Sequence, residues 1–307
     1  MSKNVLVIGS INVDYVIHTA RLPKLGETLT GSDFAMNFGG KGANQASALA
    51  KTGCCVKMLG AVGSDLSGDL ARKNLESFGI DTTDVLTVDA PTGAAVITVC
   101  GGDNHILLDI GANAYVTPDV IAAREHLFDW ADFVVMQYEI PMESVLFAAR
   151  MAKKHRKTVI LNPAPVKEAD PALFENVDLI IPNEFETELL TGISPDDDVS
   201  AERAIAALRG LGCANALITL GKRGCAYTEN GAVRFAGIYP VKVVDTTAAG
   251  DSFVGGICKS LGEGLSMTDA IAYASAVSAI AVSRPGAAAS IPSADEVSEF
   301  LKVNTLQ

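Results

Sequence analysis

A short stretch near residue 250 combines small residues with two carboxylates and precedes a predicted helix. Its sequence is Asp-Thr-Thr-Ala-Ala-Gly-Asp over residues 245–251, and the helix is expected from about residue 249 to residue 260. Because the first N–H groups of a helix lack internal partners and carry partial positive charge, this stretch could bind an anion, phosphate above all. Asp251 would repel a bound phosphate, but it could accept the proton of a hydroxyl that attacks one. Taken alone, the stretch is explained more simply as an ordinary capped helix.

Polar side chains also follow apolar runs that predict buried strands. Asn12 and Asp14 come after the run 5–9, and their alternate spacing on an extended segment makes them face the same way. Because ligands of open α/β sheets bind at the carboxyl ends of the strands, this pair could hydrogen-bond neighbouring hydroxyls of one sugar. Glu139 similarly follows the run 133–136. The alternatives are a turn stabilised by Asn and Asp, and a carboxylate in the first turn of a helix.

A glycine-rich turn, Gly-Gly-Lys-Gly-Ala-Asn over residues 39–44, opens a helix predicted over residues 43–51. The glycines permit close backbone approach, while Lys41 and Asn44 offer a charge and an amide. The G-x-x-x-x-G-K-[ST] spacing is absent, and Gln45 occupies the third glycine position of G-x-G-x-x-G. The turn is therefore not a P-loop, and a nicotinamide dehydrogenase is disfavoured.

Two further motifs place asparagine, glycine and charge at the ends of predicted strands. Asn183 and Glu186 lie three residues apart at the start of a helix that is expected to reach residue 190. They form either a capping box or a site in which Glu186 holds Mg²⁺ through water. The second motif, Gly-Lys-Arg-Gly over residues 221–224, is either a phosphate clamp or a solvated hairpin.

The elements that must position these residues alternate between strands and helices, which predicts an α/β fold with a mainly parallel sheet. Strands are predicted at residues 5–9, 56–62, 133–136, 158–161, 179–181, 216–220 and 225–228, and residues 241–244 are expected to be extended. Helices are predicted at residues 43–51, 67–78, 201–208, 249–260, 267–282 and 294–301. Residues 13–37 and 92–109 instead read as short antiparallel strands, and together they could form one small sheet that acts as a lid and excludes water.

The composition limits location and partners. The chain has 307 residues and a net charge of −12, which suits one large α/β domain and disfavours nucleic acid and anionic lipid as partners. No signal peptide is recognised before the first strand, and the apolar-rich residues 270–282 are too short to span a bilayer. The six cysteines form no C-x-x-C pair and are expected as free thiols in the cytoplasm. The four histidines are dispersed, so no metal is assigned to them.

The order and chemistry of these sites resemble the ribokinase/PfkB family of sugar kinases over essentially the whole chain. The most specific motifs are G-G-K-G-A-N-Q-A at residues 39–46 and D-T-T-A-A-G-D at residues 245–251. The resemblance implies a single domain with a three-layer, Rossmann-like fold and a small β-sheet lid. It also implies that the 5-hydroxyl of ribose takes the γ-phosphate of ATP, a substrate choice to which Lys41, Asn44 and Glu139 point in particular.

The resemblance also assigns roles to the candidate residues. Asp251 is the base, and the N–H groups of Ala248, Ala249 and Gly250 form the anion hole. The sugar is held by Asn12, Asp14, Gly40, Lys41, Asn44 and Glu139, together with Asp251. The nucleotide meets Asn183, Thr219, Gly221, Lys222, Gly224, Gly250 and Ser275, while Glu186 organises Mg²⁺ through water. A K⁺ site matches Asp245, Thr247, Ala281, Arg284, Gly286 and Ser290.

Two residues depart from the family pattern. Ala248 stands where many members have glycine, which is tolerable if its φ angle is negative. Ser275 falls where a larger polar residue near the adenine is expected, so the nucleotide preference stays open.

Other functions remain compatible with the same motifs. A kinase for deoxyribose, a ketohexose or a nucleoside would keep them, since one altered hydrogen bond can change the substrate. A non-catalytic sugar-binding protein on the same fold is a more distant alternative, against which the intact stretch around Asp251 argues. Members of the family often dimerise through their lids, and apolar residues on both faces of the predicted lid lead us to expect a homodimer.

Overall fold

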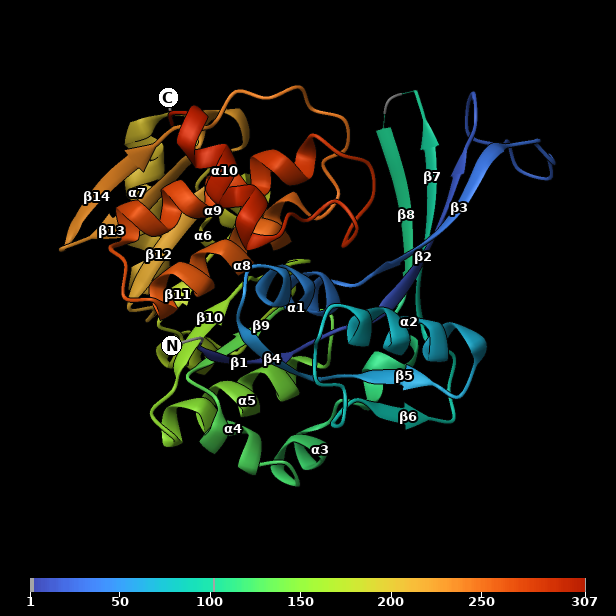
Figure 1. Ribbon diagram of the computed structural model, residues 1–307, viewed down its shortest axis with the longest axis horizontal. Helices are drawn as coiled ribbons and strands as arrows, with labels where there is room; N and C mark the ends of the chain where they lie inside the picture. Colours follow the sequence, from blue (N-terminus) through green and yellow to red (C-terminus); the bar gives the residue numbers. More distant parts are fainter. Residues whose placement is uncertain (1–2, 102, 307) are drawn as a thin grey trace.

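A central sheet of eight strands forms the middle layer of the molecule (Figure 1). The computed structural model describes residues 3–101 and 103–306. The strand order is β14-β13-β12-β11-β10-β9-β1-β4, parallel from β12 to β4 and antiparallel at β13 and β14. The bounds are β1 Asn4–Ile8, β4 Cys55–Leu59, β9 Phe133–Met136, β10 Thr158–Leu161, β11 Leu179–Ile180, β12 Asn215–Thr219, β13 Cys225–Glu229 and β14 Ala232–Ala236.

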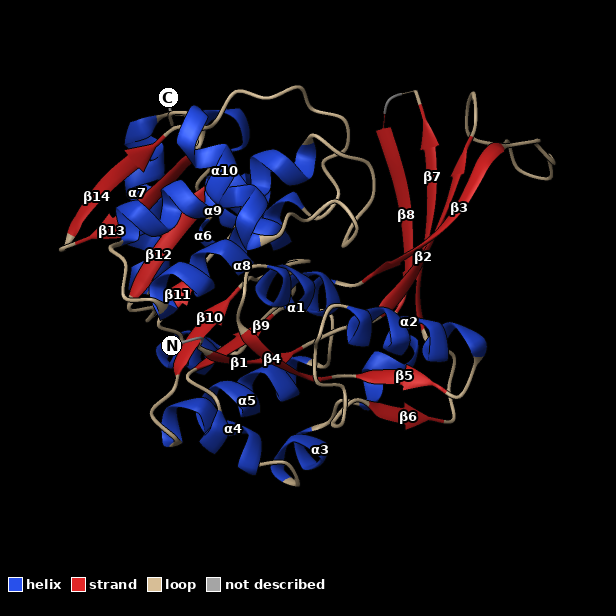
Figure 2. Cartoon of the chain, in the orientation of Figure 1, coloured by secondary structure: helices blue, strands red, loops and turns tan. Residues whose placement is uncertain are grey.

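Helices cover both faces of this sheet because its strands are apolar on both sides (Figure 2). In β1, Val5 and Val7 belong to one buried cluster and Leu6 and Ile8 to the other. The cluster of Val5 lies under α1 (Lys41–Lys51), α2 (Leu66–Ser77), α8 (Ala249–Gly262) and α9 (Met267–Val282), with α10 (Ala294–Val303) against α9. The opposite face carries α3 (Pro118–Ala122), α4 (His126–Trp130), α5 (Met142–Lys154) and α7 (Asp198–Gly210), with α6 (Glu184–Thr191) beside α7. These three layers confirm the predicted fold class.

A second sheet of four strands stands apart from the main body, at the upper right of Figure 1. Its order is β3-β2-β7-β8, with β2 at Asn12–His18, β3 at Ser32–Gly39, β7 at Gly93–Cys100 and β8 at Asp103–Asp109. We call this sheet the lid. The expectation of a purely antiparallel lid was wrong, because β2 and β7 pair in parallel from Asn12↔Gly93 to His18↔Val99. Parallel pairing is possible here because β4 to β6 intervene between the two strands and bring the chain back to the same end of the sheet.

One local prediction needs correction. The run 56–62 is two strands, because β4 ends at Leu59 and β5 (Ala61–Gly63) pairs instead with β6 (Leu86–Val88). Residues 241–244, which were expected to be extended, lie outside the strands; the backbone N–H of Val244 donates to the carbonyl of Val282 at 2.8 Å. The edge strand β14 was not predicted, since most of its residues are exposed and carry no buried pattern.

Short 3₁₀ helices complete the described chain at Gly111–Tyr115, Pro171–Asn176 and Gly221–Arg223. Among the described residues, none of the helices has both the length and the apolar character that crossing a membrane requires.

Candidate active site

Asp251 lies in the first turn of α8 and is almost completely buried, with 6% of its surface exposed. Both of its carboxylate oxygens accept hydrogen bonds from side chains of α1. Asn44 Nδ2 lies 3.0 Å from Oδ2, and Gln45 Nε2 lies 2.9 Å from Oδ1. A buried carboxylate needs such donors, because an unpaired charge in the interior is strongly disfavoured. The Asp251 carboxylate is therefore held in place by a helix more than 200 residues away in sequence.

The start of α8 has an unusual backbone conformation. Ala248, which precedes the helix, has φ = 59° and ψ = 13°, in the left-handed region. The condition under which an alanine is easily tolerated here, a negative φ, is therefore not met, and the conformation costs about 1–2 kcal/mol for a residue with a Cβ. The N–H of Ala249 already donates to the carbonyl of Thr246 at 3.1 Å. The N–H groups free for an anion are therefore those of Ala248 and Gly250, and Gly250 is exposed.

Asp14, near the start of β2, faces both Asp251 and Glu139, which follows β9. Burial, together with the negative charges of Glu139 and Asp251, raises the pKa of the Asp14 carboxyl to about 6. Glu139 Oε2 accepts a hydrogen bond from Ser10 Oγ at 2.5 Å and from the backbone N–H of Lys41 at 2.9 Å. Glu139 thus ties the end of β1 to the start of α1.

Lys41 provides positive charge among these carboxylates. Burial alone would lower the pKa of its ammonium group, but the charges of Asp251, Glu139 and Glu186 outweigh burial and raise it. Gly40 caps α1 with φ = 88°, a conformation that favours glycine. A Cβ at this position would also lie 2.8 Å from the backbone nitrogen of Asn12. Glycine therefore allows the turn to approach the end of β1.

Asn12 is buried and held by a residue that the sequence did not indicate. Its Oδ1 accepts a hydrogen bond from Asn113 Nδ2 at 2.8 Å, and Asn113 Oδ1 accepts one from the N–H of Ile11 at 2.9 Å. A Cβ at Gly93 would lie 2.3 Å from Asn12 Oδ1, so glycine leaves room for this contact.

A pocket of about 190 Å³ joins the sugar-side and nucleotide-side candidates. Its lining includes Lys41, Asn183, Glu186, Thr219, Ala248, Ala249, Gly250 and Asp251. A larger, open hollow of about 810 Å³ lies elsewhere, around Lys3, Thr52 and Lys259. That hollow contains none of the candidate residues, so the smaller pocket is the site that the structure assembles.

Asn183 and Glu186 form the capping box that the sequence allowed as one of two alternatives. Asn183 Oδ1 accepts the N–H of Glu186 at 2.8 Å, and Glu186 Oε2 accepts the N–H of Asn183 at 2.9 Å. Glu186 is nevertheless buried against the pocket, and this burial raises the pKa of its carboxyl. Capping and ligand binding are therefore compatible, since only one carboxylate oxygen serves the cap.

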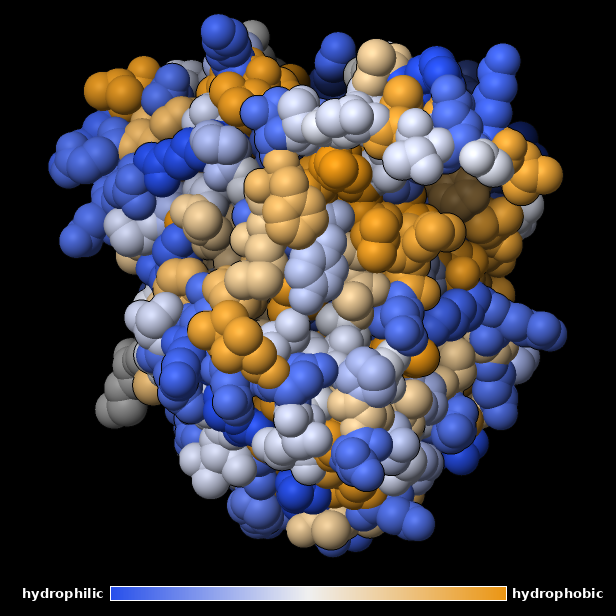
Figure 3. All heavy atoms as spheres, turned by 90° about the vertical axis from the view of Figure 1, so that its right-hand side faces the viewer, coloured by the Kyte–Doolittle hydropathy of each residue, from blue (hydrophilic) through white to orange (hydrophobic). Residues whose placement is uncertain are grey.

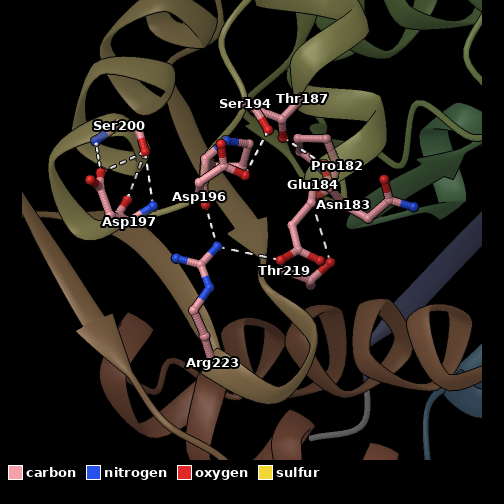
Figure 4. A network of polar contacts seen from close by, with 11 residues as sticks. Pro182, Asn183, Glu184, Thr187, Ser194, Asp196, Asp197, Ser200, Thr219 and Arg223 are labelled. Atoms are coloured by element: carbon pink, nitrogen blue, oxygen red, sulfur yellow. Dashed lines mark hydrogen bonds and ion pairs between the residues drawn. The ribbon is translucent and has the colours of Figure 1, made fainter.

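The turn at residues 221–224 lies beside α6, as Figure 4 shows. Arg223 points away from a phosphate role, because it pairs with Glu184 at 3.3 Å and donates to the carbonyl of Pro195. Lys222 is exposed, and Gly221 and Gly224 have φ angles of 53° and 84°. Of the two cations in this turn, only Lys222 thus remains available to a ligand.

The residues matched to a K⁺ site are only partly brought together. Asp245 Oδ1 accepts from the Thr247 hydroxyl at 2.6 Å, and Oδ2 accepts from the N–H of Gly286 at 2.9 Å. Burial would raise the pKa of Asp245, but these hydrogen bonds outweigh it and lower the pKa. The other matched residues make contacts of their own: Arg284 pairs with Glu296, the N–H of Arg284 donates to the carbonyl of Ala281, and Ser290 Oγ donates to the carbonyl of Ala287. Ser275, matched to the nucleotide, is half-buried on α9 and does not line the pocket.

Sequence reasoning missed a group of polar residues behind Asp251 and Asn12. Gln45 stands inside the glycine-rich motif, and Asn162 follows β10 just as Asn12 follows β1, so both carried a positional signal. Gln137 follows β9 directly and carried the same signal, whereas Asn113 carried none, because its partners Ile11 and Asn12 lie about 100 residues earlier in the chain.

A fixed carboxylate beside a helix N-terminus, next to a lysine and a second carboxylate, is an arrangement suited to phosphoryl transfer to a hydroxyl group. The sequence pattern of the pfkB family carbohydrate kinases matches residues 2–294, so the chain belongs to this family.

Relatives of known name match the chain over nearly its full length. It is 40% identical over 304 residues to a ribokinase of Haemophilus influenzae, covering 98% of this chain and 99% of that protein. It is 36% identical over 304 residues to a deoxyribokinase of Salmonella typhi, with the same coverage. Among solved structures, an Arabidopsis thaliana ribokinase complexed with ribose and ATP aligns with a TM-score of 0.93 at 32% identity, covering 98% of this chain and 99% of that one.

Proposed function

We propose that this carbohydrate kinase transfers the γ-phosphoryl group of ATP to the 5-hydroxyl of D-ribose. The observation that carries the proposal is the buried carboxylate of Asp251, held by two amide donors at the start of α8. It lies on the wall of the pocket that also contains Lys41 and Glu186. The ribokinase that binds ribose and ATP, and the ribokinase that is 40% identical, support the choice of substrates.

In this mechanism Asp251 accepts the hydroxyl proton as the hydroxyl oxygen attacks the γ-phosphorus. The bond from the γ-phosphorus to the oxygen of the departing ADP breaks in the same step. The N–H groups of Ala248 and Gly250 stabilise the charge on the transferring group, and Ala249 contributes through the dipole of α8. Removing one such donor typically costs about 10²–10³ in rate.

The sugar lies between the lid and α1, where its hydroxyls meet Asn12, Asp14, the backbone at Gly40, Lys41 and Glu139. Asn44 has one side-chain partner in the protein and room for a second. Its Nδ2 donates to Asp251, whereas its Oδ1 is buried without a hydrogen-bond partner. Because an unsatisfied buried acceptor is costly, Asn44 Oδ1 is suited to accept a hydrogen bond from a sugar hydroxyl.

The nucleotide lies on the other side of Asp251, against Asn183, Thr219, Gly221, Lys222, Gly224 and Ser275. Carboxylates exceed lysines around the pocket, since Asp14, Glu139, Glu186 and Asp251 face Lys41 and, near Glu139, Lys167. Binding of an anionic nucleotide there requires added cations. The described residues contain no group of three or more His, Cys, Asp or Glu side chains that could hold a metal ion. Mg²⁺ commonly keeps several waters and is held through one or two carboxylates and phosphate oxygens.

Glu186 would hold such a Mg²⁺ through water, and the ion would supply neutralisation of the phosphate charge. A K⁺ ion near Asp245, Thr247 and Gly286 would add positive charge on the far side of the α8 N-terminus. The carbonyl of Ala281, the backbone at Arg284 and Ser290 would complete its ligands.

We further propose that two copies associate through their lids. The lid exposes Phe34, Met36, Val96 and Leu107, with 67%, 41%, 49% and 76% of their surfaces accessible. Hydrophobic side chains gather on the face of the molecule that carries the lid (Figure 3). An exposed apolar face of this kind favours burial against another protein surface. Sedimentation should give a dimer at micromolar concentration and a monomer for Leu107→Glu; a monomeric wild type would exclude the dimer.

With six free thiols, we expect the protein to act in the cytoplasm.

The deciding experiment is an ADP-release assay with Mg²⁺ and K⁺ against D-ribose, 2-deoxy-D-ribose, ketohexoses and nucleosides. D-Ribose should give the highest kcat/KM, and Asp251→Asn should lower kcat by about 10²–10⁴. Asp269→Asn is the matched control, because Asp269 is an exposed carboxylate in the first turn of the next helix. Preference for another sugar would overturn the substrate, and ribose binding without turnover would favour a non-catalytic sugar-binding protein.

A further inference from the structure

Behind Asp251 lies a chain of buried side-chain amides. Gln45 Nε2 donates to Asp251 Oδ1 at 2.9 Å and to Asn162 Oδ1 at 3.1 Å. Gln45 Oε1 accepts a hydrogen bond from Gln137 Nε2 at 2.6 Å. Gln45 and Gln137 are both completely buried. Four residues from α1, α8 and the ends of β9 and β10 therefore share one network, in which Gln45 and Gln137 are shielded from solvent while Asp251 and Asn162 line the pocket.

The network fixes which end of the Gln45 amide faces Asp251. Asn162 Nδ2 donates to the carbonyl of Ile181 at 2.9 Å, so its oxygen must face Gln45. Gln137 presents an N–H group to the oxygen of Gln45. Asn162 and Asp251 therefore oppose a flipped Gln45, which would place its amide oxygen against their oxygens. The amide nitrogen of Gln45 is thus aimed at Asp251 before any ligand binds.

Glycine at the end of β1 makes room for this arrangement. A Cβ at Gly9 would lie 2.1 Å from Gln137 Oε1 and 2.9 Å from the Cα of Gly42. A residue with a side chain at this position would therefore displace the Gln137 amide, which donates to Gln45. Glycine at residue 9 thus leaves the space that the Gln137 side chain occupies.

We propose that Gln45, oriented by Asn162 and bonded to Gln137, is a positioning residue that keeps the Asp251 carboxylate aimed at the substrate hydroxyl. The inference rests on the proposed function, in which Asp251 is the base. Gln45 differs from Asn44, the other donor to Asp251, because Asn44 retains a free acceptor for the sugar. Gln45 has both ends of its amide engaged within the protein, so its contact with Asp251 does not depend on the ligand.

The test replaces Gln45 with leucine, which removes the donor and retains similar bulk. A hydrogen bond to a charged group is worth about one to two pH units of carboxylate ionisation. We therefore expect the acidic limb of the kcat profile to move up by about one pH unit and kcat at neutral pH to fall at least about tenfold. KM for ATP and for the sugar should change less than about twofold, since Gln45 contacts neither. Charged groups that face Asp251, namely Lys41, Asp14 and Glu186, are unchanged in this variant.

Two further variants separate positioning from general damage to α1. Gln137→Leu should move the acidic limb in the same direction by a smaller amount, because it removes the N–H that Gln45 Oε1 accepts while the contacts of Gln45 with Asn162 and Asp251 remain. Ser47→Ala should leave the profile unchanged, because Ser47 is a buried polar residue of the same helix whose hydroxyl donates to the carbonyl of Ala43. An unchanged pH profile in Gln45→Leu, or a loss expressed mainly in KM, would overturn the inference.

A readout without turnover keeps the inference separate from the proposed function. In protein labelled with ¹³C at the aspartate carboxyls, the Asp251 signal is assigned by its absence in Asp251→Asn. Its titration midpoint should be about one pH unit higher in Gln45→Leu than in the wild type. An equal midpoint would refute the role of Gln45, whereas a higher midpoint in a protein that phosphorylates no sugar would support it and refute only the proposed reaction.

Discussion

The two halves of the candidate site differ in how much of their structure exists before a ligand arrives. Around Asp251, the side chains of Asn44 and Gln45 are 6% and 0% exposed and already make their hydrogen bonds. On the nucleotide side, Asn183, Lys222 and Gly250 are exposed. The side of the site around Asp251 is therefore pre-assembled in the protein interior. The nucleotide side instead presents backbone groups and the flexible side chain of Lys222 to solvent.

The difference follows from the charge that each half must manage. A buried carboxylate needs hydrogen-bond donors even when no ligand is bound, so the fold supplies them. A nucleotide phosphate brings its own charge and cations, and exposed N–H groups at a helix start cost little when they are solvated. Rigid placement of the base also saves ordering entropy when the sugar binds.

Removal of Lys41 should disturb the pre-assembled half most. In Lys41→Met, the surrounding carboxylates lose the ammonium group that faces Asp251, Glu139 and Glu186. We expect kcat/KM to fall by about 10²–10³, as for loss of a transition-state electrostatic contact. Steady-state kinetics should be compared with Lys73→Met, which removes an exposed lysine from α2. Equal, small losses of kcat/KM in the two variants would show that the Lys41 ammonium group does not balance the charge of the buried carboxylates.

Asp14→Asn should trade activity for stability. The pKa of Asp14 is raised from 3.8 to about 6, so the folded protein binds more protons than the unfolded chain between these values. Its stability therefore falls as pH rises through this window, and the ionised carboxylate costs about 2–3 kcal/mol above pH 6. Urea unfolding should show the Asn variant more stable by about this amount at pH 7, with the gain shrinking toward pH 4. The same variant should bind ribose about tenfold or more weakly; a gain independent of pH would refute the assignment.

Ala248→Gly should change stability more than activity at the start of α8, where the two halves of the site meet. Glycine relieves the left-handed conformation of residue 248, although it also increases the entropy of the unfolded chain. A net stabilisation of about 0.5–1 kcal/mol is expected in urea unfolding. Because the N–H is retained, kcat should change less than about threefold, and a large loss would mean that the methyl group itself contributes to the site.

Lys222→Ala should have the smallest effect, because an exposed cation in water contributes at most about 1 kcal/mol. KM for ATP should rise less than about fivefold at physiological ionic strength, and the effect should grow as salt is lowered. An ATP titration at two salt concentrations tests this. A loss as large as that of Lys41→Met would show that the nucleotide side closes around its ligand. The two halves of the site would then not differ in their exposure to solvent during the reaction.

Much of the framework follows from local sequence patterns. The runs that became β9 and β10 were predicted to the residue, and α9 was predicted with its observed bounds. These elements have strong local signals: fully apolar strands and capped helices are encoded by neighbours in the chain. The small residues before Asp251 likewise identified the helix start that carries the candidate base.

Tertiary structure decided what no short window of sequence contains. It paired β2 with β7 in parallel, committed Arg223 to Glu184, and placed Ala248 at a positive φ angle. It also brought Gln45 and Asn44 to Asp251, although local pattern assigned Gln45 no role and Asn44 only to the sugar. The physical reason is that a buried amide or carboxylate takes whichever partner the packed layers bring within hydrogen-bond distance. That partner depends on the register of helices and strands far apart in the chain, whereas strand burial and helix capping depend on adjacent residues.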